Sequence, residues 1–184
     1  MADHGQPGTE ELRLHLLVLR CQTGDERAFA QLFREFGERT LRYLNGLVGE
    51  AAEDVQQEVW LAVYRGIRTL SNARAFRTWL FRTTRHRAID FLRRRRRESE
   101  LLADAALERI GLSESAEDSL EVDEAALRLA LETLPAAQRE VLILRYRDDL
   151  SYAQIALVVG CARGTVRSRL QAKQRMQELM ERSR

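Results

Sequence analysis

The sequence is poor in the residues on which several classes of protein depend. It contains only two cysteines and two prolines among 184 residues. Cys21 and Cys161 lie far apart, and no histidine or second cysteine stands beside either of them at the spacing of a metal site. This spacing argues against a disulfide-stabilised scaffold and against a bound metal. We therefore expect two packed or partly exposed thiols in a reducing cytosol, with no cofactor.

Long apolar runs are also missing. No stretch approaches the length of a membrane span, and the polar residues from Met1 to Glu10 do not resemble a signal peptide. Alternation of apolar and polar residues, which is typical of strands, is absent over any useful length. These features predict an all-α protein that is cytoplasmic and not inserted in a membrane.

The formal net charge of +2 hides a strong partition along the chain. Residues 72–97 hold ten arginines and one aspartate, about +9, whereas residues 98–124 hold ten acidic residues and one arginine, about −9. Residues 160–184 hold six arginines and one lysine against two glutamates, about +5. Two basic surfaces separated by an acidic segment suggest two anion-binding sites.

Helical periodicity divides the chain into two domains. After a polar tail over residues 1–9, we expect one helical domain over residues 10–97, an acidic linker over 98–122 and a second helical domain over 123–184. In the first domain, Leu12, Leu16, Leu17 and Leu19 predict one helix. Later stripes predict a second after Asp25, a third from Ala51 and a fourth over 75–95. In the last of these, Phe76, Leu80, Ile89 and Leu92 form the expected inner stripe. A further helix is possible over 101–110.

The second domain contains a helix-turn-helix. Ser151 and Gln154 form a predicted capping box, Ile155 and Ala156 face inward, and Gly160 ends the first helix. The second helix has Val166 and Leu170 on its inner face. Its outer face carries the residues expected to contact DNA in the major groove: Arg163, Thr165, Arg167, Ser168, Arg169, Gln171 and Lys173. Of these, Arg169 and Lys173 are expected to contact phosphates.

The arginines of residues 74–97 have two interpretations. They are either a solvated helix end or a surface that binds nucleic-acid phosphates. Aromatic residues among them are platforms on which unpaired bases can stack. Trp79 and Phe81 lie in an apolar stripe, however, and for them a place in the core is favoured over base stacking. The density of arginine favours a surface for single-stranded or melted nucleic acid.

Five segments of the sequence resemble a known family. Ala52-Glu-Asp-Val-Gln-Gln-Glu-Val-Trp-Leu61, Ala75-Phe-Arg-Thr-Trp-Leu-Phe-Arg82 and Ala88-Ile-Asp-Phe-Leu-Arg-Arg-Arg95 are similar to region 2 of extracytoplasmic-function (ECF) sigma factors of the sigma-70 family. Leu134-Pro-Ala-Ala-Gln-Arg-Glu-Val141 and Gly164-Thr-Val-Arg-Ser-Arg-Leu170 are similar to region 4. The resemblance covers about residues 22 to 180, in the same order as in the family.

The resemblance implies a transcription initiation factor without enzymatic activity. It would bind core RNA polymerase, through the β′ clamp helices and the β flap, and direct it to promoters by reading −35 and melting −10 elements. An anti-sigma factor is a further expected partner. The implied polymerase contacts are Asp54, Gln57, Glu58, Trp60, Leu61 and Arg65. The implied −10 contacts are Ser71, Asn72, Arg74, Phe76, Arg77, Trp79, Arg82, Arg85, His86, Asp90 and Arg93. The helix from Arg163 to Lys173 would read the −35 element, centred on Arg167 and Ser168.

The chain departs from the family pattern in three respects. His86 stands where the family often has asparagine, the stretch from Gln171 to Arg175 replaces a denser pattern of arginines, and the linker is unusually acidic. Two other classes of protein compete with the sigma factor. One is a stand-alone helix-turn-helix regulator with an N-terminal sensing domain, which would bind duplex DNA without polymerase. The other is a nucleic-acid enzyme, for which Glu53, Asp54 and Glu58 form the single close acidic group.

Overall fold

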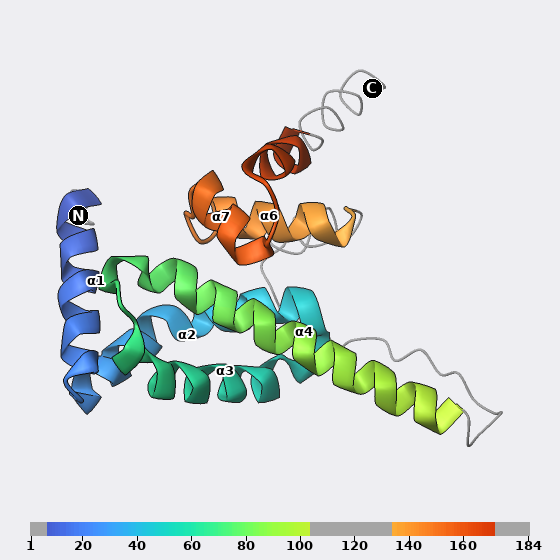
Figure 1. The fold of residues 1–184 in the computed structure, drawn as a ribbon, viewed down its shortest axis with the longest axis horizontal. Coiled ribbons are helices and arrows are strands. Elements are labelled where there is room, and N and C mark those ends of the chain that lie inside the picture. The colour runs from blue at the N-terminus through green and yellow to red at the C-terminus, as the bar shows by residue number, and fades with distance from the viewer. Residues whose placement is uncertain (1–6, 104–133, 172–184) are drawn as a thin grey trace, which may run out of the picture. The chain divides into compact units, whose positions relative to one another are not determined.

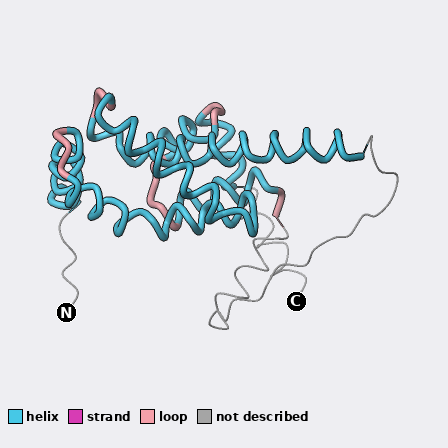
Figure 2. Tube along the Cα trace, turned by 90° about the horizontal axis from the view of Figure 1, so that it is seen from below, coloured by secondary structure: helices cyan, strands magenta, loops and turns pink. Residues whose placement is uncertain are grey.

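The computed structural model describes residues 7–103 and 134–171. Side-chain surroundings are described for residues 8–99 and 134–171. These residues form helices joined by short turns (Figures 1 and 2). No strand occurs among them, so the all-α prediction is confirmed for this part of the chain. The chain divides into two compact units, residues 1–108 and 109–184. None of the helices described is both long and apolar enough to span a membrane.

The first unit is a bundle of four long helices with three 3₁₀ turns between them (Figure 1). In chain order these are α1 (Pro7–Gln22), α2 (Glu26–Val48), η1 (Gly49–Ala51), α3 (Ala52–Gly66), η2 (Ile67–Thr69), η3 (Ala73–Ala75) and α4 (Phe76–Ala103). α2 packs against α1, α3 and α4, and α3 packs against α4. α2 therefore lies at the centre of the packing in this unit.

The helix α1 begins earlier, and buries a different face, than the sequence predicted. It starts at Pro7, inside the expected tail, which suits proline because the first turn of a helix needs no amide donor. Its buried residues are Leu14, Leu17, Val18 and Cys21. Leu17 was predicted correctly, but Leu12, Leu16 and Leu19 are between 40% and 56% exposed. The helix has leucines on both faces, so periodicity did not identify the face that α2 covers.

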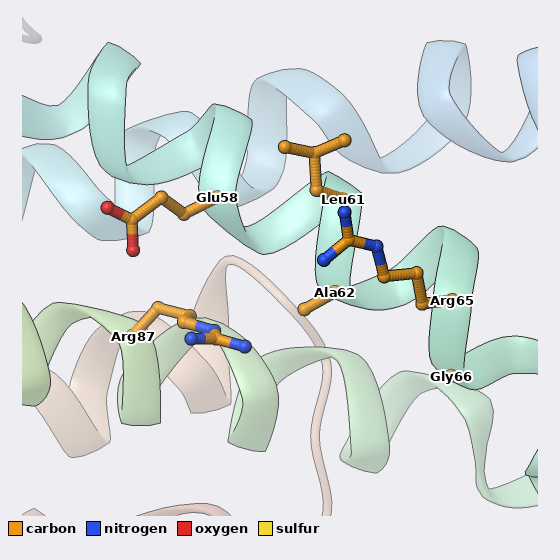
Figure 3. A pocket seen from close by; sticks show the side chains of 6 residues that line it. All are labelled: Glu58, Leu61, Ala62, Arg65, Gly66 and Arg87. Atoms are coloured by element: carbon orange, nitrogen blue, oxygen red, sulfur yellow. The ribbon is translucent and has the colours of Figure 1, made fainter.

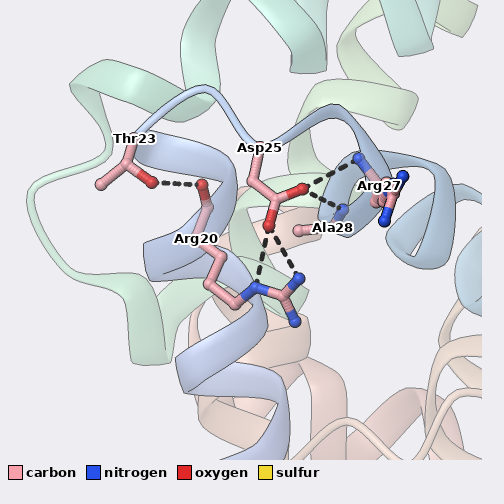
Figure 4. Close-up of polar contacts among 5 residues, drawn as sticks. All are labelled: Arg20, Thr23, Asp25, Arg27 and Ala28. Atoms are coloured by element: carbon pink, nitrogen blue, oxygen red, sulfur yellow. Dashed lines mark hydrogen bonds and ion pairs between the residues drawn. The ribbon is translucent and has the colours of Figure 1, made fainter.

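A compact polar turn joins α1 to α2 (Figure 4). The Asp25 carboxylate accepts from the backbone N–H groups of Arg27 and Ala28, both at 3.0 Å, and thereby caps α2. Its other oxygen accepts from Nε and Nη2 of Arg20, at 3.0 and 2.7 Å. Gly24 has φ +90°, a conformation that glycine adopts at least cost. The predicted stop and cap at residues 23–25 are confirmed.

Aromatic and β-branched residues build the core of this unit. Phe36 of α2 meets Phe76 of α4 edge to face, with ring centroids 5.6 Å apart, and Tyr43 meets Phe81 in the same way at the same separation. All four rings are fully buried. The third helix, α3, contributes Val55, Val59 and Val63, also buried. Phe81 is therefore core, as expected, and is not available for stacking on bases.

The buried thiol of Cys21 belongs to this core. Burial, followed by the nearby Asp25 carboxylate, raises the pKa of Cys21 to about 11. A thiol with such a pKa is almost wholly protonated at neutral pH, and the thiol form is a poor nucleophile and metal ligand. Among the residues described, no three histidine, cysteine, aspartate or glutamate side chains come together to hold a metal.

The fourth helix, α4, differs from its prediction in both length and inner face. It runs to Ala103, beyond the expected end near residue 95, and so includes the first residues of the acidic segment. Phe76, Leu80 and Ala88 are buried as an apolar stripe requires. Leu92, expected on the inner face, is 41% exposed. The helix thus leaves the core before the arginine run at 93–97, all of which is exposed.

The second unit contains α6 (Ala136–Tyr146), α7 (Tyr152–Val159) and a helix over residues 163–171. Pro135 occupies the N-cap position of α6, one residue before the predicted first turn. Val141, Leu144, Ile155 and Val166 are fully buried and form its core. The expectations for the tail at residues 1–6, for most of the acidic linker and for Lys173 fall outside the described residues.

Two glycines in this bundle should respond in opposite ways to an added methyl group. A Cβ at Gly66 would lie 2.9 Å from Cζ2 of Trp79, whereas one at Gly37 would make an ordinary contact of 3.6 Å with Phe33. Gly66→Ala should destabilise the first unit by about 1–3 kcal/mol through overpacking. Gly37→Ala should be neutral or stabilise it by about 0.5–1 kcal/mol. Because Trp60 and Trp79 are the only tryptophans, urea unfolding followed by tryptophan fluorescence reports on this unit alone. Equal effects of the two substitutions would contradict the prediction.

The Asp25 cap should make the stability of the first unit depend on pH. The hydrogen bond from the Ala28 amide, followed by that from Arg20, lowers the pKa of Asp25 below its ordinary value of 3.8. Stabilisation from a carboxylate whose pKa is lowered by folding is present above that ordinary value and is lost as the pH falls through the folded value. Asp25→Ala should therefore destabilise the unit at pH 7, and the difference from the wild type should shrink towards pH 2. Thr23→Ala removes an uncharged hydrogen bond of the same turn and should show no such trend.

Candidate nucleic-acid and partner interfaces

An exposed stripe follows α3. Asp54, Gln57, Leu61 and Arg65 are exposed, and their spacing of three or four residues places them on one face. Leu61 is 56% exposed, which is unusual for a leucine in the middle of a helix whose other side lies in a core. The structure therefore brings together four of the six predicted polymerase contacts as one strip of mixed apolar and charged character.

Trp60 does not belong to this strip. It is 6% exposed, its indole N–H donates to Oγ1 of Thr40 at 3.4 Å, and its ring packs edge to face on Phe33 and Phe29, at 5.0 and 5.9 Å. A side chain so enclosed cannot contact a partner directly. The expectation of a direct contact is corrected: Trp60 fastens α3 to α2 and so fixes the direction in which the strip points.

Glu58, the remaining predicted contact, is half-buried at the edge of the strip that faces α4. It lines an open pocket of about 380 Å³ with Leu61, Ala62, Arg65, Gly66 and Arg87 (Figure 3). Arg87 comes from α4, and Arg94 of the same helix donates from Nη2 to both Glu58 carboxylate oxygens, at 3.0 Å each. The sequence did not predict this contact because the two residues are 36 positions apart. The pair is about half exposed, so it orients Glu58 more than it stabilises the fold.

The predicted −10 contacts begin in the loop between α3 and α4. Ser71, Asn72 and Arg74 are exposed there. The Asn72 side chain accepts from the Arg74 amide at 3.0 Å and caps η3, while the next residue, Ala73, is buried. The loop is thus pinned by one small apolar residue and presents polar side chains on both sides of it.

Along α4 the exposed predicted residues share a face. Arg82, His86 and Arg93 are separated by four and seven residues, which places them on one side of a helix. Nδ1 of His86 lies 3.2 Å from Oδ2 of Asp90, so this acidic residue orients the imidazole. Arg77 and Arg85 are half-buried. Arg77 lies over the ring of Phe36, 6.0 Å from its centroid, with Glu10 at 3.8 Å.

Two aromatic members of the −10 set lie partly or wholly in the core. Phe76 is fully buried, so its side chain is not exposed for the predicted contact with DNA. Trp79 is half-buried, with its ring centroid 6.1 Å from that of Phe76 and its edge against Gly66. Part of the Trp79 side chain therefore remains accessible. The family resemblance implied DNA contacts for both rings, whereas the apolar stripe favoured a place in the core for Trp79.

The helix-turn-helix is present in detail. The Ser151 amide donates to Oε1 of Gln154 at 2.8 Å, and the Gln154 amide donates back to Oγ of Ser151 at 3.3 Å. Gly160 has φ 72° and ψ 41°, and its N–H donates to the Ala156 carbonyl at 2.9 Å. Ile155 and Ala156 are buried in α7, and Val166 and Leu170 in the following helix, as predicted.

The outer face of the helix over residues 163–171 is free to enter a groove. Arg163, Arg167, Ser168 and Gln171 are exposed, and Thr165 and Arg169 are half-buried. The Ser168 hydroxyl donates to the Thr165 carbonyl at 3.0 Å. That bond uses its one hydrogen and leaves its oxygen as an acceptor, which suits an amino group on a base edge.

These features define a class: an all-helical DNA-binding protein with one helix-turn-helix and a second, separate basic surface. Comparison with known proteins makes the class specific. Residues 32–98 match the family Sigma-70 region 2, and residues 124–172 match Sigma-70, region 4. The chain is 36% identical over 167 residues to the RNA polymerase sigma-H factor of Pseudomonas aeruginosa, covering 84% of this chain and 86% of that protein. It is 32% identical over 174 residues to the ECF RNA polymerase sigma-E factor of Escherichia coli K12, covering 88% and 91%.

Solved structures have the same fold. A structure of RpoE in complex with the anti-sigma factor NepR from Bartonella quintana has a TM-score of 0.61 and 28% identity, covering 85% of this chain and 98% of that one. CnrH in complex with the cytosolic domain of CnrY has a TM-score of 0.63 at 23% identity, covering 93% and 99%. The chain belongs to the ECF sigma factors of the sigma-70 family. It is a transcription initiation factor that directs RNA polymerase to promoters, and it acts by binding rather than by catalysis.

Proposed function

We propose that the two units divide promoter recognition between them. In this proposal the α3 strip docks on the β′ clamp helices of core polymerase, and residues 71–93 hold the melted −10 element. The segment from residue 163 to 173 reads the −35 element, while its unit contacts the β flap. The observation that carries the proposal is the presence, in two separate units, of exposed arginine faces on helices whose opposite faces are buried. One binding event at a bipartite promoter would use both faces.

We also propose that the protein acts in the cytoplasm, because its proposed partner, core polymerase, works there. We also propose an anti-sigma partner for this chain, which the complex of the related RpoE with NepR supports. A protein that covers the α3 strip would compete with polymerase for Leu61. Covering this leucine removes apolar surface from water, which favours binding of either partner.

The whole proposal is tested by run-off transcription with core polymerase over a library of randomised promoters. Templates that give transcripts should carry two constrained blocks, one at −35 and one at −10. The chain without polymerase should bind the same duplexes weakly, because each unit reads only part of the promoter. Tight, sequence-specific duplex binding without polymerase, with no promoter-dependent transcript, would instead identify a stand-alone regulator.

The docking strip predicts the behaviour of two variants that both break the Glu58–Arg94 pair. Glu58→Lys reverses a charge at the edge of the strip and should lower core affinity at least tenfold, equivalent to about 1.4 kcal/mol. Arg94→Met removes the partner and leaves Glu58 in place, so core affinity should stay within about twofold, since an exposed pair contributes little. Affinity for core polymerase is measured by fluorescence anisotropy without DNA. If Arg94→Met weakens binding as much as Glu58→Lys, then the ion pair, and not docking, explains the loss.

The helix-turn-helix predicts different consequences for two neighbouring arginines. Arg167 is exposed at the centre of the outer face, and Arg169 is half-buried at its side. Arg167→Ala should relax selectivity at one base pair of the −35 element and cost about 1–3 kcal/mol there. Arg169→Ala should weaken all −35 sequences alike and reduce the dependence on salt. Competition among −35 variants for holoenzyme measures both effects, and uniform weakening by Arg167→Ala would exclude a base contact.

A further inference from the structure

The side chain of Gln22, at the last residue of α1, connects two ends of the bundle that are remote in sequence. Its amide Nε2 donates to the carbonyl oxygen of Ile67 at 3.0 Å and to that of Leu70 at 2.7 Å. These carbonyls belong to the first residue of η2 and to the residue that follows η2. One amide group therefore spans the 3₁₀ turn that leads from α3 into Ser71.

The chemistry of the contact suits a neutral amide. A carboxamide nitrogen carries two hydrogens, and two carbonyl acceptors use both of them. The Ile67 carbonyl also accepts from the Leu70 amide at 3.2 Å, which closes the turn. Without Gln22, the turn would keep that backbone bond, and the Leu70 carbonyl would lose this partner.

The turn after Gln22 also lies close to η2, because a Cβ added at Gly24 would stand 3.2 Å from Nη2 of Arg68. In addition, α1 packs against both η2 and η3. Beyond η2 the loop is anchored by the buried Ala73, and its exposed residues lie between and beside these anchors.

We infer that Gln22 is a positioning residue for −10 recognition: it fixes the loop that carries Ser71, Asn72 and Arg74. The inference rests on the proposed function of that loop. Gln22 itself is half-buried against the loop backbone and belongs to none of the interfaces proposed above. Its effect reaches DNA only through the backbone of residues 67–70. The α3 strip is fixed separately, by the valines and Trp60 that pack α3 into the bundle.

The test uses two near-isosteric variants in the full chain. Gln22→Met keeps the length of the side chain and removes both donors. Gln22→Glu keeps the shape but places acceptors against two carbonyls. The matched control is Arg13→Met, which removes a different hydrogen bond of α1, from Arg13 Nη2 to Oε2 of Glu35 in α2 at 2.7 Å, in which no atom of the loop takes part.

Four measured quantities separate positioning from a general loss of structure. Hydrogen exchange of the free protein should rise at the amides of residues 68–74 in both Gln22 variants and not in Arg13→Met. With core polymerase, transcription from the preferred −10 sequence should fall about three- to tenfold, the equivalent of one ordinary hydrogen bond. Discrimination among −10 variants should fall with it, while core affinity stays within about twofold of the wild type.

Each result of these measurements either supports or overturns a positioning role for Gln22. The inference is overturned if Gln22→Glu keeps wild-type exchange and −10 discrimination, because the donors would then be irrelevant. It is also overturned if core affinity and −10 activity fall together, because Gln22 would then only support the fold. Failure of the proposed function itself has a different signature, since the wild-type chain would then give no promoter-dependent transcript.

Discussion

The contact between Phe36 and Phe76 governs the first unit, because it fixes where α4 begins. A helix is a rigid periodic object, so anchoring its first residue sets the direction of each later side chain. With Phe76 buried, Leu80 and Ala88 turn inward and Arg82, His86 and Arg93 turn outward. A change of one residue in the register of this anchor would rotate the arginines by about 100° and bring charge towards the core. The basic face is thus a consequence of the packing.

Sequence reasoning was most accurate where the signals are local. The capping box at Ser151, the left-handed Gly160 and the Asp25 cap each involve residues within five positions of one another, and all are present as predicted. It was less accurate about which face of a helix is buried. In α1 the stripe of Leu12, Leu16 and Leu19 is as periodic as the buried one, and only the position of α2 distinguishes them. The choice depends on a partner helix, and the hydrophobic pattern of α1 alone does not encode it.

Contacts between distant residues account for the rest of what was missed. The Glu58–Arg94 pair spans 36 positions and the bond from Gln22 to Leu70 spans 48. Neither residue type is distinctive at its position, and both contacts arise from how helices pack. The burial of Trp60 and Phe76 likewise results from the packing of helices that are distant in sequence. The family resemblance names segments, whereas burial decides which members of a segment are exposed to a partner and which ones hold the segment in place.

The two cysteines differ in a way that is useful chemically. Cys21 is buried and its pKa is raised, while Cys161 is half-exposed just after Gly160, between the two helices of the DNA-binding motif. Because the thiolate is the reactive species, alkylating reagents at neutral pH discriminate strongly between two such thiols. The native chain therefore offers one preferred point for attaching a fluorophore, close to the recognition helix. Promoter binding by this sigma factor can be followed with a site-specific dye and no engineered cysteine.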